Sequence, residues 1–258
     1  MPHTALITGA SSGIGAEFAR YHAAKGGDVI LSARSKGALD SLADELRSAH
    51  GITAHVFAAD LGAANGAQDL VQRIEAAGLD VDILINNAGF GGQGRHIDRD
   101  LTEEQAMIDL NVKALVALTH HFGGRMAAND GGRILNVASS AAFMPGPMQG
   151  VYFATKAFVK SYSEAVAYEL RNDGVSVTVL APGYVDTAFA DRADLHGTNL
   201  VKGAGKSAAS VAKHGYDAML KGKLVTVNEK PLSLLVNWII PLLPRWRVLK
   251  LINTMQTK

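Results

Sequence analysis

Short apolar runs alternate with longer amphipathic stretches along most of the chain. The runs are rich in Val, Ile and Leu and apolar on both faces, which is typical of buried parallel strands. They are Ala5–Thr8, Val29–Ala33, Ala54–Ala58, Ile83–Asn86, Arg133–Ala138, Ser176–Ala181 and Leu224–Val227. The amphipathic stretches predict helices at 13–25, 38–50, 66–77, 102–128, 151–172 and 207–221. Repeated strand–helix–strand units predict an α/β fold, a doubly wound parallel sheet with helices on both faces.

No linker rich in Pro, Gly or Ser and no internal repeat divides this pattern. The pattern predicts a single domain over residues 1–228 and a C-terminal extension over 229–258. A length of 258 residues fits one α/β domain. Residues 183–206 are weakly patterned and rich in Gly, Asp and Ala, so we expect a mobile loop that lies over a site.

The extension has the pattern of two short helices. Pro231 can begin the first, in which Leu232, Leu235, Val236 and Ile239 fall at helical spacing. Pro241 and Pro244 interrupt it. In the segment that follows, apolar and basic side chains alternate: Trp246, Leu249 and Ile252 with Arg245, Arg247, Lys250 and Lys258. Such a segment either covers the substrate cleft or a subunit interface, which we favour, or lies on a membrane surface.

Composition excludes several classes of protein. Hydrophobic residues make up 48% and charged residues 19%, which excludes a mainly disordered chain. A net charge of +1 provides no basic face for nucleic acid. The absence of Cys excludes disulfides, thiolate catalysis and Cys-based zinc sites, and it fits a reducing, cytoplasmic location. We expect no metal site, no signal peptide and no transmembrane helix, because no basic start precedes a long apolar run.

A glycine-rich turn joins the first predicted strand to the first helix. It contains Gly9, Ser11, Ser12, Gly13, Ile14 and Gly15. Backbone N–H groups at a helix N-terminus present partial positive charge to a phosphate, and glycines let that phosphate approach. The glycines do not follow the G-x-G-x-x-G spacing, so by itself this segment could also be an ordinary tight turn.

Four motifs occur in order, each at the carboxyl end of a predicted strand. They are Thr8–Gly15 (T-G-x-x-x-G-I-G), Asp60–Leu61, Asn86–Gly89 (N-N-A-G) and Pro182–Gly183 with Thr187 (P-G-x-x-x-T). Together they resemble the short-chain dehydrogenase/reductase family of about 250 residues. The resemblance implies a Rossmann fold, whose ligands bind at the carboxyl ends of the strands.

Tyr152 and Lys156 lie four residues apart, which places both on one face of a helix. They match the family's Y-x-x-x-K motif, thirteen residues after Ser139, and Asn111 matches its fourth catalytic member. The resemblance implies that Tyr152 is the general acid/base and that Lys156 lowers its pKa and binds the nicotinamide ribose. It also implies that Ser139 binds the substrate oxygen and that Asn111 holds a water in a proton relay.

The resemblance also implies a set of cofactor contacts. They are Gly9, Ser11, Ser12, Gly13, Ile14, Gly15, Arg34, Asp60, Leu61, Asn87, Ala88, Gly89, Tyr152, Lys156, Pro182, Gly183, Val185 and Thr187. Charge indicates which nicotinamide cofactor to expect. The second strand ends in Ser32, Ala33 and Arg34, with no acid for a ribose hydroxyl and with a cation for a 2′-phosphate. We therefore predict NADP (NADPH).

The sequence thus predicts an NADP-dependent carbonyl reductase/alcohol dehydrogenase that forms a homo-dimer or homo-tetramer. Its small-molecule substrate is expected to be apolar, in a pocket bordered by Phe143, Met144, Pro145, Met148 and Phe189. Two alternatives stay open. One is an epimerase or dehydratase of the same family, although such chains are usually longer. The other is a non-catalytic cofactor-sensing module, although such proteins often lose the Tyr or the Lys.

Overall fold

The computed structural model describes residues 3–129, 131–202 and 205–257, and it shows a seven-stranded parallel sheet. The strands are β1 (Thr4–Thr8), β2 (Asp28–Ala33), β3 (Ala54–Ala58), β4 (Ile83–Asn86), β5 (Gly132–Val137), β6 (Val175–Leu180) and β9 (Val225–Thr226). Their order is β3-β2-β1-β4-β5-β6-β9. The predicted doubly wound sheet is therefore confirmed. Its winding reverses between β1 and β4, the place where such sheets bind ligands.

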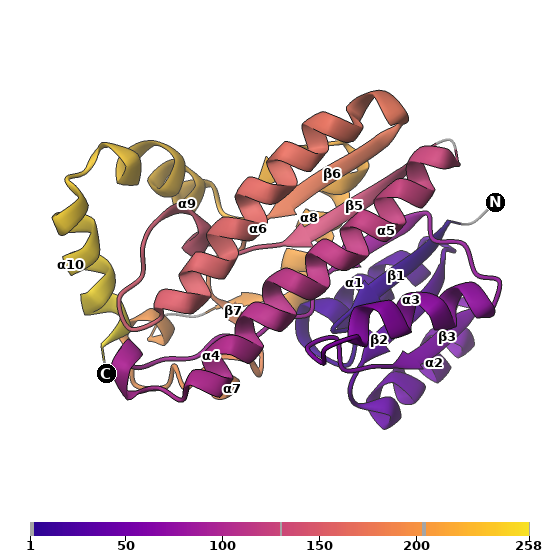
Figure 1. The fold of residues 1–258 in the computed structure, drawn as a ribbon, viewed down its shortest axis with the longest axis horizontal. Coiled ribbons are helices and arrows are strands. Elements are labelled where there is room, and N and C mark those ends of the chain that lie inside the picture. The colour runs from indigo at the N-terminus through magenta and orange to yellow at the C-terminus, as the bar shows by residue number, and fades with distance from the viewer. Residues whose placement is uncertain (1–2, 130, 203–204, 258) are drawn as a thin grey trace.

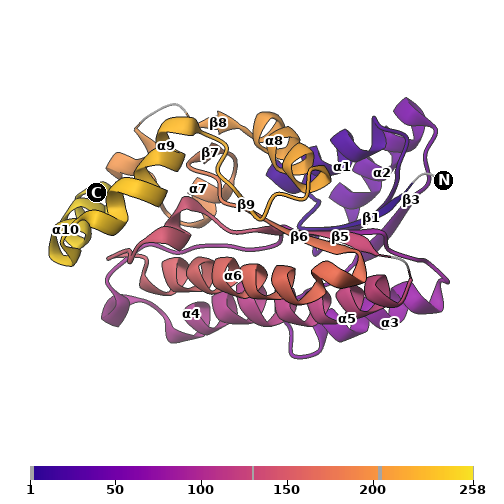
Figure 2. The same cartoon turned by 90° about the horizontal axis from the view of Figure 1, so that it is seen from above.

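Helices cover both faces of this sheet (Figure 2). On one face lie α1 (Gly13–Ala23), α2 (Lys36–His50) and α8 (Ala208–Leu220). On the other lie α3 (Gly66–Ala76), α5 (Leu115–Ala128) and α6 (Gly150–Glu169). Alternate residues of each strand point to opposite faces, so Ile7 joins the core under α1 while Leu6 joins the core under α3. These two cores hold the carboxyl ends of the strands in one fixed edge.

The predicted helix over 102–128 is interrupted by a wide turn. It comprises α4 (Leu101–Ile108), a π-helical turn over Asp109–Ala114, and α5. Asn111 lies in the π turn, where its side chain bonds both backbone groups of Phe90: it accepts from the amide N–H (3.1 Å) and donates to the carbonyl (2.9 Å). π turns inside α-helices often mark functional positions. Here the turn ties the long helix to the loop that follows β4.

Residues 183–206, predicted as a loop, contain short elements of their own. They are β7 (Val185–Asp186), α7 (Phe189–Arg192), a 3₁₀ turn at Asn199–Val201, and β8 (Lys206–Ser207), which pairs with β7. Ala190, Ala193 and Leu195 form a small buried cluster that the weak pattern of the sequence did not indicate. Residues 203 and 204 lie outside the described part of the chain.

The C-terminal extension is helical and lies at the end of the molecule away from the N-terminus (Figure 1). It begins with α9 (Lys230–Leu234) and continues through a π turn (Leu235–Ile239) and a 3₁₀ turn (Ile240–Leu242). After the predicted break at Pro241 and Pro244 comes α10 (Arg245–Gln256). Lys258, which we assigned to its basic face, lies outside the described residues. Among the described residues, no helix is long and apolar enough to cross a membrane.

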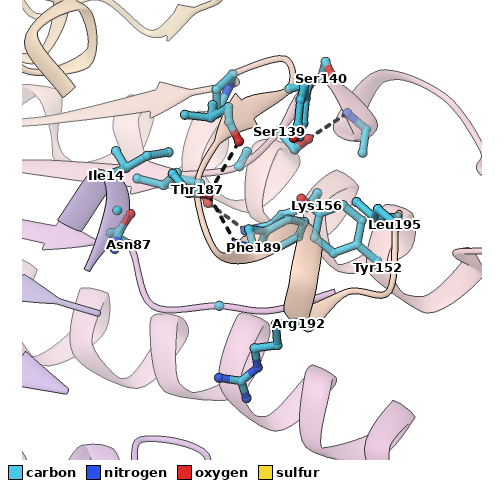
Figure 3. Close-up of a pocket in the computed structure, with 18 of the residues that line it drawn as sticks. Ile14, Asn87, Ser139, Ser140, Tyr152, Lys156, Thr187, Phe189, Arg192 and Leu195 are labelled. Atoms are coloured by element: carbon cyan, nitrogen blue, oxygen red, sulfur yellow. Dashed lines mark hydrogen bonds between the residues drawn. The ribbon is translucent and has the colours of Figure 1, made fainter. Parts of the chain in front are cut away.

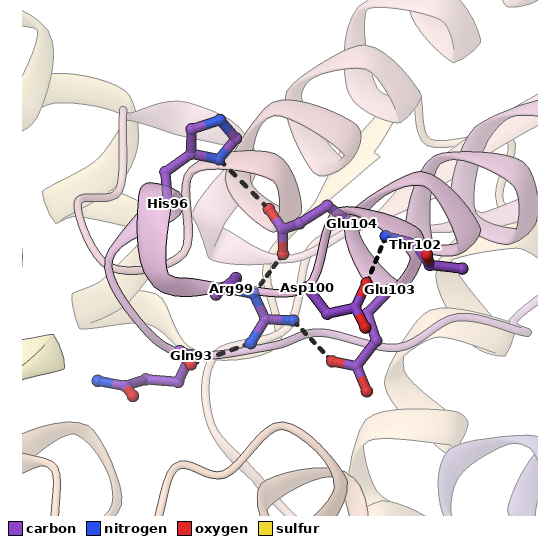
Figure 4. Close-up of polar contacts among 7 residues, drawn as sticks. All are labelled: Gln93, His96, Arg99, Asp100, Thr102, Glu103 and Glu104. Carbon is purple, nitrogen blue, oxygen red and sulfur yellow. Dashed lines mark hydrogen bonds and ion pairs between the residues drawn. The ribbon is translucent and has the colours of Figure 1, made fainter.

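The loop between β4 and α4 is clamped by one arginine (Figure 4). The Arg99 guanidinium bonds the buried carboxylate of Glu104 and donates to the Gln93 carbonyl at 3.0 Å. A Cβ on Gly92 would overlap the same guanidinium, so a side chain there would displace the clamp. Since Gln93 donates to the backbone carbonyl of Gln256 at 2.9 Å, this loop in turn fixes the end of α10.

Candidate active site

The carboxyl ends of the central strands border a cavity of about 590 Å³. Its wall brings together the glycine loop after β1, the ends of β2, β4, β5 and β6, one face of α6, the segment 182–200 and the C-terminal extension. This volume is within the usual range for ligand sites. Almost all predicted cofactor contacts line this one cavity, although they are far apart in the sequence.

The glycine loop has the shape of a phosphate cradle. Gly9 and Gly13 have positive φ angles (+66° and +55°), which favour glycine. A Cβ on Gly9 would lie 2.8 Å from the Asn87 side-chain nitrogen, so the loop and β4 can only be this close with glycine there. Ser12 occupies the N-cap of α1, but its side chain does not cap the helix. The N-terminus of α1 therefore offers backbone donors to an anion, as a dinucleotide diphosphate requires.

Gly15 is the exception among the predicted contacts of this loop, because it does not line the cavity. A Cβ there would lie 2.2 Å from the Gly9 carbonyl oxygen and 2.6 Å from the Asn87 side chain. The residue is glycine so that α1 can pack against its own loop and the end of β4. Its role in the structure is to shape the cradle.

Asn87 and Thr8 fasten the glycine loop to β4. The Asn87 side-chain amide donates to the backbone carbonyls of Thr8 (3.0 Å) and Gly9 (3.3 Å). The Thr8 hydroxyl accepts from the backbone N–H groups of Asn87 and Ala88, each at 3.0 Å. Asn87 lines the cavity, yet its amide is engaged with the loop, so the structure supports a role in holding the cradle.

Tyr152, Lys156 and Ser139 meet in the cavity (Figure 3). Tyr152 and Lys156 lie one turn apart on α6, both buried, with the Lys156 Nζ 5.8 Å from the centre of the Tyr152 ring. Nζ donates to the Val137 carbonyl at 2.9 Å. Ser139 follows β5, and its hydroxyl accepts from the Ala141 N–H at 3.2 Å. All three side chains line the cavity.

Asn111 lies behind this group and does not line the cavity. Besides its two bonds to the Phe90 backbone, its side-chain amide donates to the Thr155 hydroxyl at 3.1 Å on α6. Gly89 must be small here, because a Cβ would lie 2.9 Å from the Asn111 oxygen. These contacts support a positioning role, in which Asn111 joins the loop after β4 to α6. The water-holding role expected from the sequence stays a prediction.

Burial determines the protonation of the two titratable groups. It raises the pKa of Tyr152 to about 12, although a hydrogen bond to Ser139 acts in the opposite direction. It lowers the pKa of Lys156 to about 8. The Lys156 ammonium donates to the Val137 carbonyl, and its expected effect on the pKa of Tyr152 stays a prediction. At neutral pH Tyr152 therefore holds its proton.

The burial of Lys156 also predicts how the free energy of unfolding depends on pH. Below pH 8 the folded protein must hold a buried ammonium at Lys156, and a shift from 10.5 to about 8 corresponds to about 3 kcal/mol. This penalty is full at pH 7 and disappears as the pH rises from 8 to 10.5. We expect Lys156→Met to raise the free energy of unfolding at pH 7 by about 1–2 kcal/mol, since Val137 also loses its donor. Urea unfolding at pH 7 and pH 10 measures this.

Lys160→Met is the matched control, one turn further along α6. Lys160 is partly exposed and pairs with Glu164 at 3.0 Å. Its replacement should change stability by less than about 1 kcal/mol at either pH. A Lys156→Met variant that is less stable than the wild type at pH 7, or whose gain persists at pH 10, would contradict the assigned burial penalty.

Arg192 is a cavity residue that the sequence analysis missed. It extends from the end of α7 (Figure 3). Its guanidinium lies 4.6 Å from the centre of the Phe90 ring. Burial, and then the positive charge of Arg34, lower the pKa of Arg192, while Asp60 and Glu103 act in the opposite direction. Among the described residues neither Arg34 nor Arg192 has an ion-pair partner. Two such cations on one cavity favour an anion between them, and the available signal was that Arg192 is the only arginine in 183–206.

Only some of the apolar residues that we expected to border the cavity line it. Of the five predicted border residues, Met144 and Phe189 line the cavity, and the Phe189 ring lies 5.5 Å from that of Tyr152. Phe143, Pro145 and Met148 are not among the lining residues; the Phe143 ring instead packs beneath the Lys160 ammonium. Apolar side chains of the C-terminal extension line the cavity in place of these three: Leu232, Leu235, Val236, Ile240, Leu251, Ile252 and Met255.

A phosphate cradle at the switch point of a doubly wound sheet, opening onto a buried Tyr and Lys beside a half-buried Ser, defines a nicotinamide-dependent oxidoreductase. The chain belongs to the short-chain dehydrogenase family, whose model matches residues 3–196. It is 34% identical to a sulfoacetaldehyde reductase of Chromohalobacter salexigens over 89% of this chain and 85% of that one.

Solved structures share the whole fold. A short-chain dehydrogenase from Sphingobium yanoikuyae in complex with NADPH is 31% identical, with a TM-score of 0.84 over 91% of this chain and 90% of that one. A member from Burkholderia phymatum in complex with NAD is 25% identical, with a TM-score of 0.82 over 100% of this chain and 97% of that one. Of these two structures, one holds NADPH and the other holds NAD.

Proposed function

We propose that the protein is an NADP-dependent carbonyl reductase/alcohol dehydrogenase in which Tyr152 is the general acid/base. The observation that carries the proposal is a buried Tyr152, protonated at neutral pH, beside Ser139 and Lys156 in the cavity that the glycine loop borders. A reductase must protonate the oxygen of the carbonyl it reduces. Tyr152 is the side chain in the cavity best suited to that step.

The cofactor would lie along the carboxyl edge of the sheet. The glycine loop and the N-terminus of α1 would hold its diphosphate, and Lys156 would lie near the ribose of the reacting end. When bound, the nicotinamide supplies the hydride. Ser139 would donate to the carbonyl oxygen and hold it near the Tyr152 hydroxyl, which transfers its proton as negative charge develops on that oxygen.

Charge at the end of β2 favours NADP over NAD. Arg34 lines the cavity at the end of β2, where we expect a 2′-phosphate to bind, and Arg192 adds a second cation from the segment 182–200. The end of β2 carries no carboxylate that would bond a 2′-hydroxyl and repel the phosphate. A phosphate bound between two guanidinium groups gains charge-assisted hydrogen bonds that a hydroxyl cannot match.

The apolar lining of the cavity indicates the class of substrate. Leucine, isoleucine and methionine side chains of the extension line the same cavity as Tyr152, so we propose an apolar ketone or aldehyde of some bulk. An epimerase or dehydratase of the family, and a non-catalytic sensing module, are the alternatives. No further feature of the cavity favours either of them. The homo-dimer or homo-tetramer and the cytoplasmic location stay predictions from the sequence.

Oxidation of reduced cofactor by the purified full chain tests the proposal. The panel contains a long-chain aldehyde, a bulky aromatic ketone, a ketosteroid and a 3-oxoacyl thioester, with sulfoacetaldehyde as the small charged contrast. We expect turnover with NADPH and a kcat/KM for the best apolar substrate at least about tenfold above that for sulfoacetaldehyde, because apolar contact area is removed from water. Absence of turnover on the whole panel with either cofactor would contradict the proposal.

A further inference from the structure

The C-terminal extension leaves several large apolar side chains exposed to solvent. We call this set the outer tail face: Leu234, Trp238, Ile239, Leu242 and Trp246. Trp238 is 70% exposed, Leu242 84% and Trp246 83%. A single exposed apolar residue is ordinary, but a cluster with two tryptophans in one short segment marks a contact surface. Tryptophan also prefers places where an apolar phase meets water.

The inner side of the same segment is fixed to the protein. Val236, Ile240, Val248 and Ile252 are buried, the last three in the cluster that contains Tyr152 and Phe153. The buried Gln256 side chain accepts from that of Gln149 at 2.5 Å, and its backbone carbonyl accepts from Gln93. The exposed side chains therefore cannot turn toward the protein unless these buried contacts and the hydrogen bonds of Gln256 break.

The charge of the segment has one sign. Residues 230–257 contain Lys230, Arg245, Arg247 and Lys250 and no Asp or Glu. All four cations are exposed, and none has an ion-pair partner among the described residues. Cations beside exposed tryptophans complement a surface that is apolar within and negative at its edge. An anionic lipid bilayer has this chemistry, and each Lys or Arg near its surface adds to the attraction.

We propose that the outer tail face binds the protein to an anionic lipid surface. A second copy of the chain is the competing occupant. A two-fold contact through this face would bring the cations of both copies to one interface, and residues 230–257 offer no carboxylate to pair with them. The charge therefore favours lipid.

The outer tail face belongs to the same extension that forms part of the cavity rim. Leu235, Leu251 and Met255 line the cavity and are partly exposed, so the apolar wall reaches the surface on the extension itself. A lipid-soluble carbonyl compound could pass from the bilayer to Tyr152 along these side chains. This part of the inference rests on the proposed function; the binding to lipid does not.

Flotation of the full chain with vesicles tests the binding. One set of vesicles contains phosphatidylglycerol and phosphatidylcholine, and the other phosphatidylcholine alone. We expect the wild type to float with the anionic set and Trp238→Ser/Trp246→Ser to partition at least about tenfold less. Arg245→Ser/Arg247→Ser/Lys250→Ser should lose the same binding. Tyr168→Ser/Leu220→Ser is the matched control: both side chains are exposed, lie on α6 and α8 outside the extension, and should not affect flotation.

Two further readouts keep the outcomes distinct. Reduction of a short water-soluble aldehyde should be unchanged in the tryptophan variant, which shows that it folds and tests the proposed function separately. Sizing without lipid identifies a self-interface. The proposal is overturned if the wild type floats with neither set, if it floats equally with both, or if the tryptophan variant dissociates from dimer to monomer while the wild type does not bind vesicles.

Discussion

Replacing Tyr152 by Phe is expected to lower kcat for carbonyl reduction by about 10²-fold or more, the scale of a lost general acid. The change removes only the hydroxyl, and the ring keeps its contacts with Phe153 and Phe189. Dissociation of NADPH, measured by its fluorescence, should be nearly unchanged, because in the proposed binding mode the glycine loop and the cations hold most of the cofactor. The measurement is steady-state kinetics with the best substrate of the panel.

Tyr162→Phe controls for loss of a hydroxyl on the same helix. Tyr162 is partly buried, burial also raises its pKa, and its ring stacks on Phe158 outside the cavity. Its turnover should remain within about twofold of the wild type, since no cavity contact changes. Turnover by Tyr152→Phe close to that of Tyr162→Phe would show that another group donates the proton.

Arg34→Asp is expected to shift the cofactor preference from NADPH toward NADH by about 10- to 100-fold. A lost hydrogen bond to a charged group is worth about 1.5–3 kcal/mol, and the new carboxylate repels a 2′-phosphate while it can accept from a 2′-hydroxyl. The measurement is the ratio of kcat/KM with NADPH to kcat/KM with NADH. A wild-type enzyme that already prefers NADH would show that Arg34 has another role.

Two variants separate the contributions to this preference. Arg192→Ser should weaken NADPH more than NADH if its guanidinium shares the phosphate with Arg34, whereas an effect equal for both cofactors would place Arg192 near the diphosphate instead. Lys36→Ser is the control, because this exposed lysine pairs with Asp40 at 2.7 Å and does not line the cavity. It should leave the ratio unchanged.

Much of the fold was predictable because buried parallel strands have a distinctive composition. All seven expected strands occur, and Ile83–Asn86 is buried at every position, as its continuous apolar run indicates. The placement of the motifs was predictable for a geometric reason. Parallel strands end at one edge, so Gly9, Asn87 and Ser139 must gather there once each is known to follow a strand.

The Tyr152–Lys156 pair shows the limit of that argument. Helical spacing places both residues on one face of α6, and in the structure both are buried on that helix, with the Lys156 ammonium near the Tyr152 ring. The direction of the Tyr152 pKa could not be inferred, because it depends on how much water the surrounding segments exclude. Those segments include Phe189 from residues 183–206 and the core that contains Ile240 from the extension, far away in the sequence.

The sequence by itself determined the doubly wound sheet, the glycine cradle and the side chains that gather at its carboxyl edge, because periodicity and motif position are local properties. Only the tertiary structure decided that Arg192 joins Arg34, that Asn111 bonds Phe90 from a π turn, and that the extension lines the cavity with one side and exposes tryptophans on the other. The physical reason is that these features depend on which surfaces two distant segments bury against each other. The amphipathic pattern shows that a helix has two faces, but only packing determines which of them meets the protein.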